Sequence, residues 1–129
     1  MTSSWLKSLH KDVITFLLVN DLGVPWETER EETEDKISIF VPSASFIERS
    51  KDNYRCEFTV RLICTISTDG IYDLSNISGA AALLLTRPLP VLGGCAMSSK
   101  EEIKIKFFDW AHGYKQSRME QNYSIDLRG

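Results

Sequence analysis

The fold is decided by residues 54–66, which read YRCEFTVRLICTI. Apolar and polar side chains alternate along this stretch, and only Ile63 interrupts the polar set. Because successive side chains of a strand point to opposite faces of its sheet, a period of two predicts a strand with one face on a core. At about 3.3 Å per residue this strand would be some 40 Å long, so it either bends or extends past the domain body. The side chains predicted to face the core are Tyr54, Cys56, Phe58, Val60, Leu62, Cys64 and Ile66.

The segments on either side of this strand predict two helices and further strands. Apolar residues at three- and four-residue steps indicate amphipathic helices, and strict alternation indicates strands. Pro42 is expected to end the strand before it, and Pro88 to end the second helix. The predicted elements, in chain order, are a helix over 4–19, a short strand over 37–41, the long strand over 54–66, a helix after the turn at 67–70, and a terminal pair of strands over 103–107 and 123–127.

This order predicts an α+β fold: a largely antiparallel four- to five-stranded sheet with two helices packed on one face. The 129 residues suffice for one core and are read as a single domain, 1–129. Within it, residues 43–53 are expected to form a loop and residues 88–99 an extended crossing between elements. Residues 108–121 are read as a continued or bulged strand, a turn and the start of the last strand.

The net charge argues against a general nucleic-acid binder. The chain carries a formal charge of −3, whereas binding through phosphates needs an excess of Lys and Arg. The acidity is concentrated: residues 27–35 carry −5, the first 26 residues carry no net charge and residues 36–129 carry +2. Like charges at this density repel one another, so we expect a solvated loop whose neutralisation leaves the fold intact. Its acidic residues are Glu27, Glu29, Glu31, Glu32, Glu34 and Asp35.

The cysteines and the apolar segments point to a soluble protein made in the cytoplasm. An odd count of three cysteines argues against a disulfide framework. Cys56 and Cys64 fall on the core face of the long strand, whereas Cys95 follows two glycines and is expected to be exposed. No stretch resembles a signal peptide or reaches the roughly 18 apolar residues of a membrane span.

No group of residues indicates catalysis, a metal or a cofactor. His10 and His112 lack the spacing to other ligands that metal sites use. Asp109 beside Trp110 has no second catalytic group nearby in the sequence, and neither a phosphate loop nor a nucleophile elbow is present. We therefore expect a protein that is not an enzyme, although a small enzyme with an unrecognised site remains an alternative.

The exposed faces of the strands are the best candidates for an interaction surface. Aromatic side chains and Arg are the residue types enriched in protein–protein contacts. An ordinary solvated face is the alternative interpretation of the same residues. The residues predicted to contact subunits or partners are Arg55, Arg61, Lys104, Lys106, Trp110 and Tyr114.

Taken whole, the pattern resembles the tail terminator, or tail completion, proteins of long-tailed bacteriophages. The matching features are the N-terminal helix, the strand pair KISIFV and YRCEFTVRLICTIS, the helix after Thr-Asp-Gly and the closing section FFDWAHGYKQSRMEQNYSIDL. The resemblance implies a structural virion protein whose copies form a hexameric ring. The ring would cap the tail tube, stop its polymerisation and join the tail to the neck proteins of the head, with DNA only passing through its lumen.

Two other interpretations remain open from the sequence. One is another phage neck or baseplate connector protein, and the other is a monomeric regulatory protein whose acidic loop binds a basic partner. Within the terminator interpretation the acidic loop has two possible places. In the lumen it would repel DNA phosphates and keep the passage open, and on the outside it would dock a basic partner.

Overall fold

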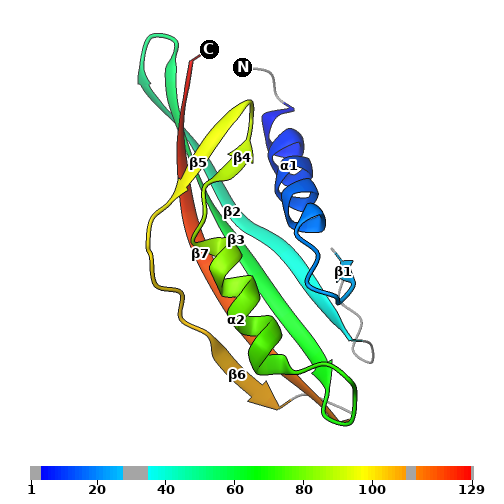
Figure 1. Cartoon of the computed structure of the whole chain (residues 1–129). Helices are drawn as coiled ribbons and strands as arrows, with labels where there is room; N and C mark the ends of the chain where they lie inside the picture. The colour runs from blue at the N-terminus through cyan, green and yellow to red at the C-terminus, as the bar shows by residue number, and fades with distance from the viewer. Residues whose placement is uncertain (1–3, 28–34, 110–112, 129) are drawn as a thin grey trace.

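The computed structural model describes residues 4–27, 35–109 and 113–128, and Figure 1 shows its layers. Three strands of 15 residues each form the middle of one sheet, and both helices lie on the same side of it. The elements are α1 (Trp5–Val19), β1 (Trp26–Glu27), β2 (Lys36–Ser50), β3 (Asn53–Ser67), α2 (Leu74–Leu85), β4 (Leu89–Val91), β5 (Gly94–Ser98), β6 (Lys106–Asp109) and β7 (Tyr114–Arg128).

The sheet is largely antiparallel, and this confirms the predicted α+β class. Its strand order is β1-β2-β3-β7-β5-β4, and β6 also pairs with β7. Only the short pairing of β1 with β2 is parallel. In the described residues the sheet has seven strands rather than four or five. The difference comes from β1, β4 and β5, which have at most five residues each and are too short to show a clear period.

The core lies between the helices and the inner face of β2, β3 and β7. Six of the seven predicted core positions of β3, from Cys56 to Ile66, lie in it and are at most 3% exposed. Opposite residues of an antiparallel pair lie on the same face, so Leu62 packs between Ile39 and Met119 of the neighbouring strands. The helices contribute Leu9, Val13 and Leu17 from α1 and Ile77, Ala81, Leu84 and Leu85 from α2.

Polar contacts hold α2 in place on the sheet. The Asp73 carboxylate accepts the backbone N–H of Ser75 at 2.9 Å and so caps the start of the helix. The hydroxyl of Tyr123 donates to the carbonyl of Leu85 at 2.8 Å near the helix end. Because a buried hydroxyl without a partner is costly, this bond fixes the helix end against β7.

The expectation that residues 88–99 form an extended crossing is wrong, because they form the β4–β5 hairpin. Leu92 and Gly93 have φ of 53° and 79°, which is the left-handed pair of a two-residue type I′ turn. The backbone N–H of Leu92 donates to the Asp12 carboxylate at 2.9 Å and ties the turn to α1. The two turn residues are Leu-Gly instead of the Asn-Gly pair that usually marks this turn type, so the sequence pattern did not predict a hairpin here.

The expectation that Pro42 ends a short strand is also wrong. Strand β2 continues through residues 43–50, which were expected to form a loop, and pairs with β3 as far as Ser50 and Asn53. The pairing shifts between Phe40 and Ser43, so Pro42 lies in a bulge. A bulge needs no ladder hydrogen bond from the proline, and the strand therefore resumes after it.

The far part of the β2–β3 pair, residues 43–58, is called the hairpin arm below. In Figure 1 it reaches beyond the start of α1, beside the last residues of β7. Phe46 stacks on Trp5 of α1 at 5.1 Å between ring centroids and on Tyr54 at 4.8 Å. Beyond this aromatic stack residues 47–53 are exposed. Of the two alternatives for the long strand, β3 therefore extends past the body of the domain.

Candidate interaction site

The outer face of the sheet, opposite the helices, carries paired polar side chains. The antiparallel pairing of β3 with β7 places the outward-facing residues of the two strands side by side. Arg55 pairs with Asp126 at 3.2 Å, and Arg61 pairs with Glu120 at 2.6 Å. Exposed pairs of this kind contribute only about 0.2–1 kcal/mol each, so they order the face more than they stabilise the fold.

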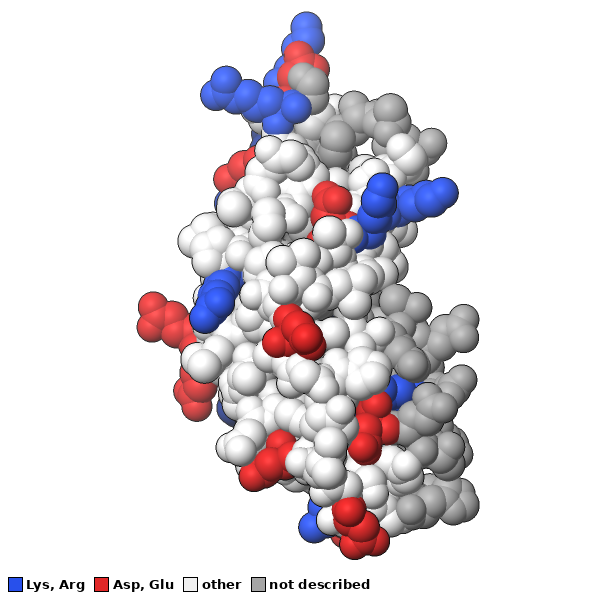
Figure 2. Space-filling model, turned by 45° about the vertical axis from the view of Figure 1, so that its right-hand side comes forward, with Lys and Arg blue, Asp and Glu red and all other residues white. Residues whose placement is uncertain are grey.

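Between these ion pairs lies a short row of hydroxyl and amide groups. Thr59 Oγ1 donates to Asn122 Oδ1 at 2.7 Å and accepts from Ser43 Oγ at 3.2 Å. The row therefore links β2, β3 and β7 across the outer face. Figure 2 shows another side of the molecule, where basic side chains lie mainly near the upper end and acidic ones are spread below, with broad uncharged surface between them.

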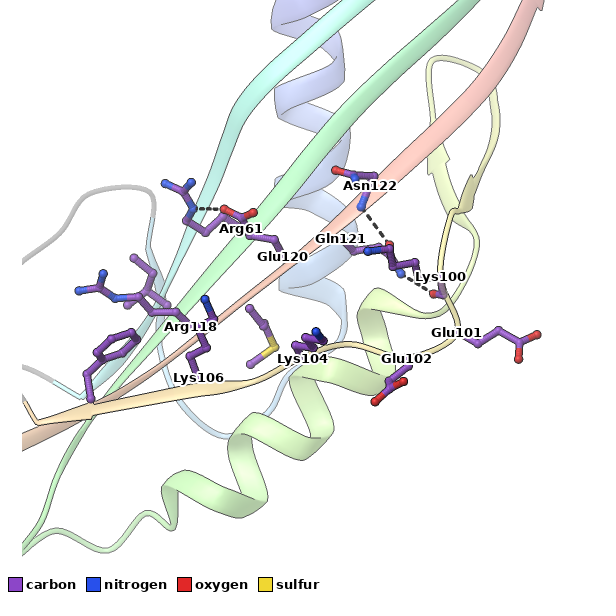
Figure 3. A pocket seen from close by; sticks show the side chains of 13 residues that line it. Arg61, Lys100, Glu101, Glu102, Lys104, Lys106, Arg118, Glu120, Gln121 and Asn122 are labelled. Atoms are coloured by element: carbon purple, nitrogen blue, oxygen red, sulfur yellow. Dashed lines mark hydrogen bonds and ion pairs between the residues drawn. The ribbon is translucent and has the colours of Figure 1, made fainter.

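A pocket of about 1020 Å³ opens beside β7 on the outer face. It forms because β5 pairs with residues 123 and 124 of β7, and β6 with residues 115–118, whereas residues 99–105 between them leave the sheet. Gln121 closes one end, since its amide donates to the Lys100 carbonyl at 2.6 Å. The lining residues, shown in Figure 3, are Arg61, Ile63, Lys100, Glu101, Glu102, Lys104, Lys106, Phe108, Arg118, Met119, Glu120, Gln121 and Asn122.

Basic side chains outnumber acidic ones around this pocket by five to three. The Arg118 guanidinium lies 4.6 Å from the centre of the Phe108 ring and donates to Gln116 Oε1 at 3.1 Å. A cation over an aromatic face is attracted by the ring, so this contact holds Arg118 at the pocket wall. Glu101 and Glu102 point away from the pocket in Figure 3. The arrangement presents positive charge next to a small apolar surface.

The structure brings three of the six predicted interface residues together. Arg61, Lys104 and Lys106 line the same pocket, although more than 40 residues separate the first from the other two. Arg55 lies on the same face of β3 as Arg61 but toward the arm, beside Asp126. Tyr114 is half-buried at the start of β7, opposite Ser67, and Trp110 lies outside the described residues. The strand expected over residues 103–107 is wrong in its first half, since β6 begins only at Lys106.

Among the pocket residues that the sequence did not indicate is Arg118. The alternation of β7 hid it, because Ser117 and Gln121 occupy inward positions although they are polar. Ser117 Oγ accepts a 2.6 Å hydrogen bond from the hydroxyl of Ser78 in α2, which satisfies it in the core. Taking Ser117 as an inward residue would have placed Arg118 on the outer face.

The acidic stretch is only partly described by the structure. Glu27 lies in β1, opposite Ser38, whereas Glu29, Glu31, Glu32 and Glu34 lie outside the described residues. Asp35 corrects the expectation of a solvated acid: it is half-buried, and its carboxylate accepts the backbone N–H of Ser67 at 2.7 Å. The carboxylate therefore joins the start of β2 to the end of β3.

We expect Asp35→Ala to lower the free energy of unfolding by about 1–2 kcal/mol, because it leaves the Ser67 N–H without its acceptor. Urea unfolding followed by circular dichroism measures this loss. Asp35→Asn is the matched control, since its amide oxygen still accepts the bond and only the charge is lost. Equal stability of Asp35→Ala and the wild type would contradict the anchoring role.

The cysteines lie as the sequence predicts. Cys56 and Cys64 are buried, Cys95 is exposed, and all three are free thiols. Burial raises the pKa of Cys56 to about 11, with a smaller contribution from Glu57. Burial likewise raises the pKa of Cys64 to about 11, against a smaller opposing effect of its hydrogen bond with Ser117. Both thiols therefore stay protonated well above neutral pH.

Among the described residues, no three His, Cys, Asp or Glu side chains gather as a metal site. No helix in the described part of the chain is long and apolar enough to cross a membrane. The chain matches no protein-family model and none of the curated proteins compared with it in sequence.

Proposed function

We propose that this protein is a tail terminator of a long-tailed bacteriophage, a structural component of the virion at the tail and neck. Copies of the chain form a ring, hexameric as in that family, that caps the tail tube and stops its polymerisation. The ring then offers its other side to a neck protein of the head. The observation that carries the proposal is the hairpin arm, which projects from the body beside an outer sheet face that no helix covers.

The arm supports a role in contacts between copies because its far end is exposed within its own chain. Strand β7 pairs with β3 as far as Asn53, and the stack of Trp5, Phe46 and Tyr54 supports the arm on the helix side, but residues 47–53 beyond this stack are exposed. Ile47 on its outer face is 41% exposed. A neighbouring copy would cover these residues and supply the missing packing.

The edge of β2 supports the same role. In the described part of the chain, β1 pairs only with Ile37 and Ser38, so the arm portion of β2 has a strand neighbour on one side only. Such an edge offers backbone N–H and C=O groups to another chain. A contact from the arm of one copy to a different surface of the next is head-to-tail, and head-to-tail contacts close into rings when the rotation fits.

Termination follows from the two unlike sides of such a ring. One side resembles the next tube ring closely enough to bind the last tube subunits, and the other side does not repeat the lattice. The acidic residues 27–35 retain their two possible places, in the lumen where they would repel passing DNA or on the outside where they would dock a basic partner. Bond chemistry is not needed for any of these steps.

Analytical ultracentrifugation of the chain over a wide concentration range tests the proposal. We expect a discrete species, because ring closure fixes the number of copies, and the resemblance to the family implies about six. Ile47→Asp should reduce that species at least about tenfold, because the contact would bury an unpaired carboxylate. Ile71→Asp is the matched control, since Ile71 is 93% exposed in a turn away from the arm.

Two results would contradict the proposal. One is a chain that remains monomeric at all concentrations and also when mixed with tail-tube subunits from the same genome. The other is equal assembly of the two variants after circular dichroism has shown both to be folded. Genes for tail-tube and neck proteins on either side of the gene are expected as independent support.

A further inference from the structure

We infer that the pocket beside β7 is a binding site for an acidic peptide segment of a partner protein, one that also carries an apolar side chain. The site is built by β3, β7 and the segment of residues 100–108, and β3 is far from the other two in the sequence. The inference does not rest on the ring, because a single copy presents the complete pocket.

The charges of the pocket favour a carboxylate ligand. Lys104 and Lys106 are exposed and line the pocket, and no residue in the described ranges forms an ion pair with either. Arg61 already shares its guanidinium with Glu120 at 2.6 Å. Together with Lys100, which is also exposed and lines the pocket, the two lysines are available to a ligand, and Figure 3 shows all three on the segment that borders β7.

The walls of the pocket favour an apolar side chain next to the carboxylates. Phe108 is 40% exposed and lines the pocket, and Ile63 beside it is 6% exposed. The Arg118 guanidinium lies over the Phe108 ring, and both side chains line the pocket. Exposed apolar surface of this kind gains free energy when a ligand side chain covers it.

The size and edge of the pocket favour a peptide over a small anion. A volume of about 1020 Å³ is at the upper end for small-molecule sites and takes several residues of an extended chain. Residues 119–122 of β7 border the gap between the pairings with β5 and β6. The Ser99 N–H donates to the Asn122 carbonyl at 2.8 Å at one end of this gap, so the strand edge already accepts hydrogen bonds from a chain beside it.

Nucleic acid fits the same pocket less well. The chain as a whole is negative at −3, and Glu120 lies within the pocket where it would face a phosphate. A phosphate backbone also needs a continuous track of cations, whereas Glu120 interrupts the basic groups here and already pairs with Arg61. The mixed lining suits a short segment with carboxylates at a few positions only.

Fluorescence anisotropy with a labelled peptide of about eight glutamate and phenylalanine residues tests the inference. We expect saturable binding to the full chain that weakens as salt rises, because exposed ion pairs are screened. The double variant Lys104→Glu/Lys106→Glu should weaken binding at least about tenfold, since each reversal turns an attraction into a repulsion. Phe108→Ala should weaken it less, through lost apolar contact alone.

The matched control is the double variant Lys7→Glu/Lys11→Glu, which makes the same charge change at exposed positions of α1 on the other side of the sheet. It should bind the peptide as the wild type does, within about twofold, as expected when only distant screened charges change. Unfolding curves of both double variants establish that they are folded.

Three results would overturn the inference. The wild type does not bind the peptide, or the two double variants lose the same amount of peptide affinity. The third is that a single-stranded oligonucleotide binds more tightly than the peptide and loses affinity in the Lys104→Glu/Lys106→Glu variant. None of these outcomes concerns ring formation. A failure of the peptide-binding inference can therefore be told apart from a failure of the proposed ring.

Discussion

Leu62→Asp is expected to unfold the protein at room temperature. Leu62 is fully buried between Ile39 and Met119 on the neighbouring strands. Its replacement removes the apolar contacts, worth about 2–5 kcal/mol for a large core side chain, and buries a carboxylate that has no partner. The total reaches the entire stability of a typical domain, about 5–15 kcal/mol. Circular dichroism and one-dimensional NMR of the purified variant would show the loss of structure.

The adjacent residue provides the control. Arg61→Asp makes an acidic substitution one position away, on the outer face, where the side chain is 42% exposed. It removes the pair with Glu120 and sets two carboxylates side by side, which should cost about 1–2 kcal/mol. Leu62→Ala, expected to lose about 2–5 kcal/mol while still folding, gives a measurable value if Leu62→Asp cannot be purified. A folded Leu62→Asp variant would show that the assigned face of β3 is wrong.

The stability of the protein is expected to fall steeply between about pH 9 and pH 11. Burial raises the pKa of both Cys56 and Cys64 from 9.0 to about 11. Above pH 9 the unfolded chain therefore loses thiol protons that the folded chain still holds, and unfolding becomes more favourable. Their contribution is fully present below pH 9 and is lost as the pH rises through 11. Burial also raises the pKa of Tyr123, which adds to the loss at the alkaline end.

Each thiol contributes up to about 2–3 kcal/mol to this loss, from a shift of about two pH units. Urea unfolding at several pH values, with reductant present, measures the effect. Cys64→Val should remove about half of the slope, because valine fills the site and does not titrate. Cys95→Ser is the control, since Cys95 is exposed and its replacement should leave the pH profile unchanged. An unfolding midpoint that stays constant to about pH 11 would contradict the burial of the thiols.

The arm and the pocket lie on the same outer face of the sheet, and this arrangement separates two kinds of contact. The arm extends β2 and β3 past the body and its far end, residues 47–53, is exposed, so it suits a large contact with another copy. The pocket is a local recess with available cations at Lys104 and Lys106, so it suits a short segment. Arg55, which pairs with Asp126, lies on the arm, and the row around Thr59 lies between Arg55 and Arg61 of the pocket.

The predictions from sequence succeeded where structure depends on nearest neighbours along the chain. The alternation of β3 follows from the pleat of a single strand, so the inward positions from Cys56 to Ile66 were readable without knowledge of any partner. The apolar stripe of α1 was readable for the same reason, since it depends only on the helical repeat. The α+β class followed from the order of these elements.

Only the tertiary structure decided which polar residues enter the core and which distant residues meet. Ser117 is buried because Ser78 of α2 satisfies it, and Asp35 is half-buried because it accepts a bond from β3. Strand β2 passes Pro42 because β3 continues beside it on the far side of the bulge. The pocket exists because β5 and β6 pair with different parts of β7, and each of these outcomes depends on a partner that no local pattern reveals.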